Sequence, residues 1–113
     1  CELSAQPKVK AETRESRQAE KRRQAEERNA ISRELKPLKD RYAKLETELE
    51  QALNRQHDVE QVMADPATYA DAARFSELSK EYHVLKEQGD TLVLELADLE
   101  ERMAALETRR EAL

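Results

Sequence analysis

The stretch that decides the fold is Met63–Phe75, MADPATYADAARF. On either side of it, apolar residues recur at spacings that alternate between three and four. The upstream row is Ile31, Leu35, Leu38, Tyr42, Leu45, Leu49, Ala52, Gln56, Val59 and Met63, and the downstream row is Phe75, Leu78, Tyr82, Leu85, Gly89, Leu92, Leu96, Leu99, Met103, Leu106, Arg110 and Leu113. A mean spacing of about 3.5 residues keeps one seam of a helix facing a partner, as in a left-handed coiled coil. Because a turn separates the two rows, the sequence predicts an all-α fold, an antiparallel two-helix coiled-coil hairpin.

The turn itself carries signals that stop one helix and start the next. Asp65 suits an N-cap and Pro66 the first helical position, which predicts one short helical turn. Asp71 is a candidate N-cap for the second long helix. The predicted register pairs Met63 with Phe75, Val59 with Leu78, Leu49 with Gly89, Leu45 with Leu92, and Leu35 with Met103. Gly89 lies on the seam, and we expect it to leave space for Leu49.

Three segments are expected along the chain. Residues 1–9 contain Pro7 and little pattern, and they are predicted to be a disordered linker remnant. Residues 10–35 form a predicted basic, charged helical segment. Proline costs little in the first turn of a helix and about 3 kcal/mol in its interior. The hairpin is therefore predicted to span 36–113, with its first helix starting near Lys36 or Pro37 and its tip near 64–72. Ile31 and Leu35 would then lie on a preceding turn, or on a helix kinked at Pro37.

Composition excludes several classes of protein. Charged residues make up 40% and aromatic residues 4% of the chain, which allows one narrow seam rather than a thick globular core. No apolar run approaches the roughly 18 residues that a membrane span needs, so no membrane partner is expected. A single cysteine suits a reducing, cytoplasmic compartment. The chain starts at Cys1 rather than Met, and we expect it to be a piece of a longer protein.

Residues that could carry chemistry are few. With one glycine the chain has no glycine-rich phosphate loop. His57 and His83 lack the further ligands that structural zinc requires. The carboxylates are spread along helical surfaces instead of gathering in a cleft that could shift a pKa. We therefore predict no catalytic, cofactor-binding or metal-binding residues, no small-molecule substrate and no enzymatic activity in this segment.

The distribution of charge is more informative. Residues 1–41 carry 12 Lys and Arg against 8 acids, whereas residues 42–113 carry 8 against 17. Arg14, Arg17, Lys21 and Arg28 recur at helical spacing, and such a stripe can neutralise successive phosphates of DNA or RNA. The candidate nucleic-acid-binding residues are Arg14, Arg17, Lys21, Arg22, Arg23, Arg28, Arg33, Lys36, Lys39 and Arg41. From composition alone, a solvated helix balanced by interleaved Glu is the simpler interpretation. Aromatic residues are absent from this part, which argues against sequence-specific reading of RNA bases.

Two family resemblances bear on function. The tip ADPATYADAARFSELSKEY (64–82), together with KRRQAEERN (21–29) and LKPLKDRYAKLETELE (35–50), resembles the C-terminal coiled-coil domain of ABC-F type ATPases of the Uup and YheS kind. That resemblance implies a helical arm attached to ATPase cassettes of the same parent chain, which bind ATP and Mg²⁺, and a role in binding DNA or the ribosome. The pattern DxxRFxxLSKEYxxL (71–85) is also similar to the helical domain of peptide-chain release factors. A purely structural spacer or dimerisation module remains a further alternative.

Overall fold

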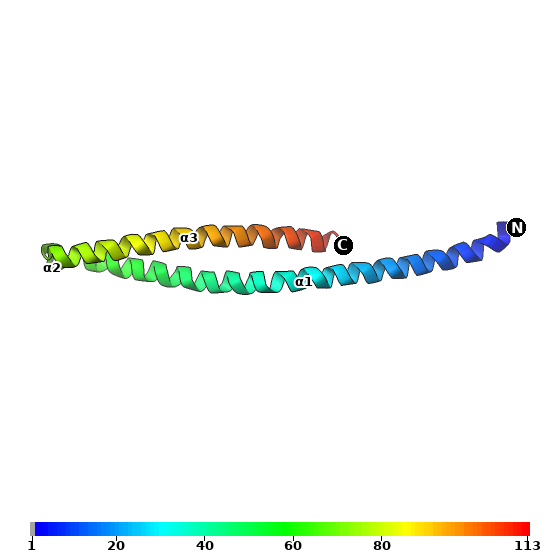
Figure 1. Ribbon diagram of the computed structural model, residues 1–113, viewed down its shortest axis with the longest axis horizontal. Helices are drawn as coiled ribbons and strands as arrows, with labels where there is room; N and C mark the ends of the chain where they lie inside the picture. The colour runs from blue at the N-terminus through cyan, green and yellow to red at the C-terminus, as the bar shows by residue number, and fades with distance from the viewer. Residues whose placement is uncertain (1) are drawn as a thin grey trace. The chain divides into compact units, whose positions relative to one another are not determined.

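The computed structural model of the chain describes the backbone of residues 2–113 and the side chains of residues 13–113. Three helices follow one another: α1 (Glu2–Met63), α2 (Pro66–Ala70) and α3 (Ala72–Glu111) (Figure 1). The described residues contain no strand, so the all-α prediction is confirmed. The chain divides into two compact units, the hairpin unit (Leu38–Met103) and the terminal unit (Cys1–Pro37 with Ala104–Leu113).

The hairpin unit packs the second part of α1 against α3 in antiparallel directions (Figure 1). Its core is formed by the buried Leu45, Leu96 and Leu99. The half-buried residues packed against that core are Leu38, Tyr42, Leu49, Leu92 and Met103. All of these belong to the two predicted rows, which confirms the coiled-coil seam. Burial of a leucine contributes about 1.5–3 kcal/mol, and the seam is therefore the main source of stability in this unit.

The turn forms as its capping residues predict. The Asp65 carboxylate accepts a hydrogen bond of 2.9 Å from the Ala67 N–H, with Pro66 directly after the cap. Asp71 accepts 3.2 Å from the Arg74 N–H and so caps the first turn of α3. The ring of Tyr69 meets the edge of Phe75 at 5.3 Å between centroids, although Tyr69 itself is 72% exposed. These caps reverse the chain in the space of one short helix.

Polar contacts flank the seam on its outer edges. Arg55 donates two hydrogen bonds to Glu81, one of 2.7 Å from Nε to Oε1 and one of 3.2 Å from Nη2 to Oε2. That contact lowers the pKa of the Glu81 carboxyl. The Tyr42 hydroxyl donates to Glu100 at 2.5 Å. Each contact joins α1 to α3, and residue numbers that rise along α1 meet numbers that fall along α3, as the antiparallel register requires.

The predicted pair of Leu49 and Gly89 is confirmed, but its expected reason is not. A methyl group built on the buried Gly89 would lie 3.8 Å from Leu49 Cδ1, an ordinary van der Waals distance. Leu49 therefore leaves room for a Cβ, and glycine is not needed there for space. The predicted pair of Leu35 and Met103 is divided between the two units and remains a prediction.

In the terminal unit, α1 continues the seam with Ile31 and Leu35, which are 4% and 2% exposed. Two contacts join α1 to the last turn of α3 and to the residues that follow it. Arg28 Nη2 donates to the Leu113 carbonyl at 2.9 Å, and Arg110 Nη1 donates to Ser32 Oγ at 3.4 Å. The end of α3 therefore lies beside residues 28–32 of α1.

The expected segment boundaries differ from the observed helix. Helix α1 begins at Glu2, so residues 2–9, predicted as a linker, are helical, and Cys1 lies outside the described residues. Placing the start of the hairpin helix near Lys36 or Pro37 was wrong, because α1 runs through Pro37 without a break. A proline inside a helix costs about 3 kcal/mol. Burial of Ile31 and Leu35 before it and Leu45 after it, about 1.5–3 kcal/mol each, offsets that cost.

Candidate nucleic-acid interface

A row of cationic side chains continues the seam of α1 toward the N-terminus. Stepping back from Ile31 by alternating three and four residues gives Arg28, Gln24, Lys21, Arg17 and Arg14. We call these five residues the basic stripe. At a rise of about 1.5 Å per residue, its members follow one another at about 5 Å and span about 21 Å. The sequence predicted a common face for these cations, and heptad counting identifies it as the seam face.

The basic stripe is exposed to solvent, and Leu113 contacts it at Arg28, its C-terminal member. The last residues of α3 contact Arg28 and Ser32, and every residue from Thr13 to Arg23 is exposed. The four cations of the stripe are all exposed, and only Gln24 is half-buried. Because the seam positions of this stripe hold polar side chains, packing an apolar helix against them would bury no apolar surface of α1.

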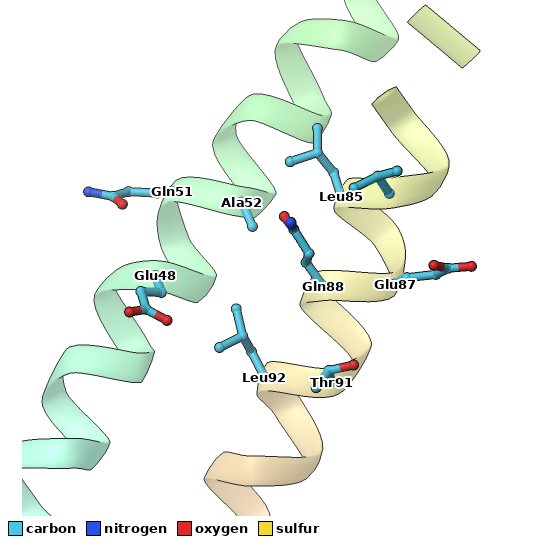
Figure 2. Close-up of a pocket in the computed structure, with 9 residues that line it drawn as sticks. Glu48, Gln51, Ala52, Leu85, Glu87, Gln88, Thr91 and Leu92 are labelled. Atoms are coloured by element: carbon cyan, nitrogen blue, oxygen red, sulfur yellow. The ribbon is translucent and has the colours of Figure 1, made fainter. Parts of the chain in front are cut away.

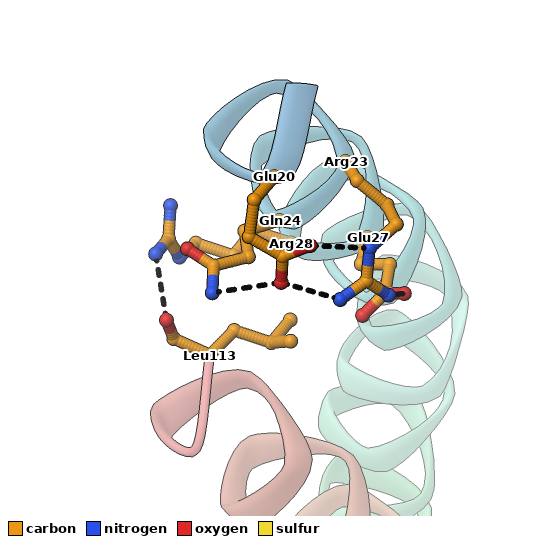
Figure 3. A network of polar contacts seen from close by, with 6 residues as sticks. All are labelled: Glu20, Arg23, Gln24, Glu27, Arg28 and Leu113. Atoms are coloured by element: carbon orange, nitrogen blue, oxygen red, sulfur yellow. Dashed lines mark hydrogen bonds and ion pairs between the residues drawn. The ribbon is translucent and has the colours of Figure 1, made fainter. Parts of the chain in front are cut away.

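Arg23 forms ion pairs with two acids that lie next to the stripe (Figure 3). Its guanidinium is 2.6 Å from Glu20 Oε1 and 2.8 Å from Glu27 Oε1. The hydrogen bond from Arg23 lowers the pKa of Glu20, and the two carboxylates raise the pKa of Arg23. Arg23 was predicted to contact nucleic acid, but its guanidinium is already paired with two glutamates. Its observed role is to hold these carboxylates on the flank of the helix.

The other predicted residues fall into two groups. Arg41 belongs to the hairpin unit, where its Nη2 lies 3.5 Å from Glu95 Oε2, and Lys39 is exposed in the same unit. Six exposed cations make no ion pair or hydrogen bond with any residue that the structure describes: Arg14, Arg17, Lys21, Arg22, Arg33 and Lys36. Among the predicted nucleic-acid-binding residues, these six have no bonded counter-ion in the part of the chain that the structure describes.

Two further cations in the terminal unit were not among the predicted nucleic-acid-binding residues. Arg109 and Arg110 form the basic last turn of α3, and Arg110 is bonded to Ser32 beside the stripe. They were missed because residues 42–113 are strongly acidic as a whole. The downstream seam row could have identified Arg110, because it is the only cation in that row.

The hairpin unit has open grooves on its surface. One groove lies between the two helices, with Ala52, Leu85 and Leu92 directed toward the interhelical space and Glu87 directed outward (Figure 2). Over the residues with described side chains, no group of three His, Cys, Asp or Glu is placed to hold a metal ion. His57 and His83 are both exposed. None of the described helices contains a stretch apolar and long enough to span a bilayer.

Comparison of the chain with models of protein families, with curated proteins and with solved structures finds no match.

Proposed function

We propose that the chain is the non-catalytic C-terminal coiled-coil arm of an ABC-F type ATPase, and that it binds the backbone of nucleic acid through the basic stripe and its neighbours. The observation that carries the proposal is the set of six exposed cations on α1 that have no counter-ion among the described residues. The hairpin fold and the tip motif that resembles the ABC-F domain support the attachment to ATPase cassettes.

The chemistry of the stripe favours a polyanion. Lys and Arg side chains that neutralise phosphates release condensed counterions, and this release supplies most of non-specific affinity. Each phosphate contact adds about −0.9 to the slope of log affinity against log salt for duplex DNA. Arg23 holds Glu20 and Glu27, which partly compensates the charge of these two carboxylates.

The side chains also favour backbone contact over base reading. Between Thr13 and Arg41 there is no Tyr, Phe or Trp that could stack on a base. The nearest aromatic, Tyr42, packs against the hairpin core and has its hydroxyl bonded to Glu100. We therefore expect binding to DNA and RNA duplexes with little dependence on sequence.

The test is fluorescence anisotropy with labelled DNA and RNA duplexes across a salt series. Replacing Arg17, Lys21 and Arg22 with Gln should weaken binding to all sequences and flatten the salt slope by about 3, one for each lost contact. The matched control replaces Lys44, Lys80 and Lys86 with Gln, three exposed lysines of the hairpin unit, and should retain the wild-type affinity. Absence of binding at low salt, or affinity that does not fall as salt rises, would rule out the interface.

The attachment to ATPase cassettes has its own test. The parent gene is expected to encode two ATP-binding cassettes ahead of this segment. A parent gene with no such cassettes would remove the ABC-F assignment while leaving the anisotropy result to decide nucleic-acid binding.

A dimerisation module is the second candidate, and exposed apolar side chains favour it. Leu94 is 72% and Val93 52% exposed on α3. Light scattering separates the two functions, because a dimer that persists on dilution and has no affinity for nucleic acid would support the module rather than the arm.

A further inference from the structure

Two open grooves run along the hairpin unit, one on each side of the seam. The groove of Figure 2 is lined by residues that directly precede seam positions, such as Glu48 and Gln88. The other groove is lined by Glu46 and Leu53, which directly follow seam positions. Its further lining residues include Tyr42, Leu49, Glu50 and Leu96. We call this second surface the Leu53 groove.

Two ion pairs between α1 and α3 lie on the side of the groove in Figure 2. They are Arg41–Glu95 at 3.5 Å and Arg55–Glu81 at 2.7 Å. Like Glu48, each of these four residues directly precedes a seam position. The pairs therefore stand one heptad before and one heptad after Glu48, and charges on that side are matched within the hairpin.

The Leu53 groove has an apolar floor that is partly open to solvent. Leu96 is buried, Leu49 is half-buried and Leu53 is 52% exposed. At a rise of about 1.5 Å per residue, the lining residues of α1 extend over about 18 Å. The floor is therefore about as long as three turns of a helix.

The rim of the Leu53 groove is acidic. Glu46 and Glu50 line it, are exposed, and make no hydrogen bond or ion pair with any residue that the structure describes. On α3, Glu100 directly follows a seam position and accepts the hydrogen bond of Tyr42, which places it on the same side. Lys86 is an exposed cation at an equivalent position of α3. Acids therefore outnumber cations around an apolar floor.

We propose that the Leu53 groove binds an amphipathic helix of a partner protein. The apolar row of that helix lies against Leu49, Leu53 and Leu96, and its Lys and Arg side chains face Glu46 and Glu50. A helix of this kind docks by laying its apolar face into an apolar groove, and opposite charges on the rim set its orientation. The groove is separate from the basic stripe, so the inference does not depend on nucleic-acid binding.

The acidic rim disfavours other occupants of the groove. A second copy of the same groove would bring Glu46 and Glu50 against like charges, and nucleic acid would bring phosphates against them. The basic part of α1 in a second copy has the opposite charge. Between Thr13 and Ala30, however, its only apolar residues are alanines, so it has no row of large side chains to cover the floor.

The test measures binding of the whole chain to a synthetic helical peptide by fluorescence anisotropy. The labelled peptide has about 18 residues, with leucines on one face and lysines beside them, and is longer than the groove. Leu53→Gln should weaken binding about tenfold, because a half-exposed leucine would no longer be covered in the complex. Val84→Gln is the matched control, since Val84 is also 52% exposed but lines the groove of Figure 2, and it should bind as the wild type does.

A second pair of variants tests the charges without touching the floor. Glu46→Gln with Glu50→Gln should weaken binding about fivefold near 0.1 M salt, and the difference should shrink near 1 M salt because exposed charges are screened. Glu48→Gln with Glu87→Gln removes two acids from the groove of Figure 2 and should leave the affinity unchanged. A peptide with glutamates in place of the lysines should bind much more weakly than the lysine peptide.

Several outcomes would overturn the inference. The wild type might as well have no groove for a helix if it fails to bind the lysine peptide at concentrations up to about 1 mM. Equal losses in Leu53→Gln and Val84→Gln, or equal affinity for the lysine and glutamate peptides, would show that neither this groove nor its charge selects the ligand. A dimer in light scattering that Leu53→Gln dissociates would mean that a second copy covers the groove instead.

Discussion

Two stretches of α1 share one spacing and differ in what occupies it. In the hairpin unit the seam positions of α1 hold side chains such as Leu45, Ala52 and Val59, which are 2%, 9% and 1% exposed, and we call this part of α1 the covered stretch. In the terminal unit the same heptad positions hold Arg14, Arg17, Lys21 and Arg28, which are all exposed, and we call this part the exposed stretch. Heptad spacing therefore predicts a face, and the chemistry of the side chains on that face decides the kind of partner.

The change from one chemistry to the other takes place within four residues. Arg28 is exposed and bonded to the end of α3, while Ile31 is 4% exposed. Because burying an unpaired arginine is costly, the stripe opposes any extension of the apolar seam past Arg28. The sequence thus defines where a covering helix of apolar character stops.

The largest expected effect tests the covered stretch. Leu45→Ala removes a side chain that is 2% exposed in the core of the hairpin unit, and it should lower the free energy of unfolding by about 2–5 kcal/mol. Leu94→Ala is the control, because the same residue type is 72% exposed on α3 and should change stability by about 0.5 kcal/mol or less. Urea unfolding followed by circular dichroism measures both. Equal losses would show that the apolar row is not the source of stability.

The second prediction makes the exposed stretch as apolar as the covered stretch. Replacing Arg17, Lys21 and Gln24 with Leu gives the exposed stretch an apolar seam, and each leucine buried against a partner contributes about 1.5–3 kcal/mol. We expect the variant to self-associate in a concentration-dependent way, as measured by light scattering.

Two controls separate the apolar row from other causes of association. Arg17→Gln with Lys21→Gln removes the same charges and should keep the wild-type mass. Leucines at Ser16, Ala19 and Ala25 are spread around the helix and should also leave the mass unchanged. Association of either control would mean that the position of the stripe on the seam face does not matter.

The fold was largely predictable because its determinants are periodic and local. Rows spaced by three and four residues identify the seam, and Asp65, Pro66 and Asp71 identify the turn through capping chemistry. The break expected at Pro37 was wrong because local preference favours a helix start there, while burial of Ile31 and Leu35 stabilises a continuous helix. Tertiary burial of this kind cannot be read from the proline itself.

The candidate interface was predictable only as a set of cations. Sequence could not divide that set, because pairing depends on rotamers that the local spacing leaves open. Arg23 lies near acids on either side and pairs with Glu20 and Glu27, whereas its neighbour Arg22 makes no hydrogen bond or ion pair with any described residue. Arg110 was missed because its contact with Ser32 joins residues that are distant in sequence.

A smaller effect is expected where the seam contains its only glycine. Gly89→Ala should raise the free energy of unfolding by about 0.8–1 kcal/mol, because alanine restricts the unfolded chain and favours helix. The new methyl group would meet Leu49 Cδ1 at 3.8 Å and needs no repacking. Ala105→Gly, at an exposed position of α3, should cost a similar amount and calibrates the intrinsic preference. A loss of stability in Gly89→Ala would show that the seam is tighter at Leu49 than the structure has it.

The smallest expected effect concerns the polar edge of the covered stretch. The hydrogen bond from Tyr42 to Glu100 raises the pKa of the Tyr42 hydroxyl to about 12, with further contributions from burial and from the charges of Glu100 and Glu46. The ordinary tyrosine pKa is about 10, so the folded chain holds this proton more tightly than the unfolded chain does.

The pH dependence follows from the sign of that shift. The contribution of the Tyr42 contact to stability should be complete below a pH of about 10 and should be lost as the pH rises to about 12. A titration of phenolate absorbance should show a transition near 12 that disappears in Tyr42→Phe and moves to lower pH in Glu100→Gln. The basic stripe contains no tyrosine, so this signal reports the covered stretch alone. If Glu100→Gln leaves the transition unchanged, the hydrogen bond between α1 and α3 is not what holds the proton, and the polar edge does not contribute to the hairpin.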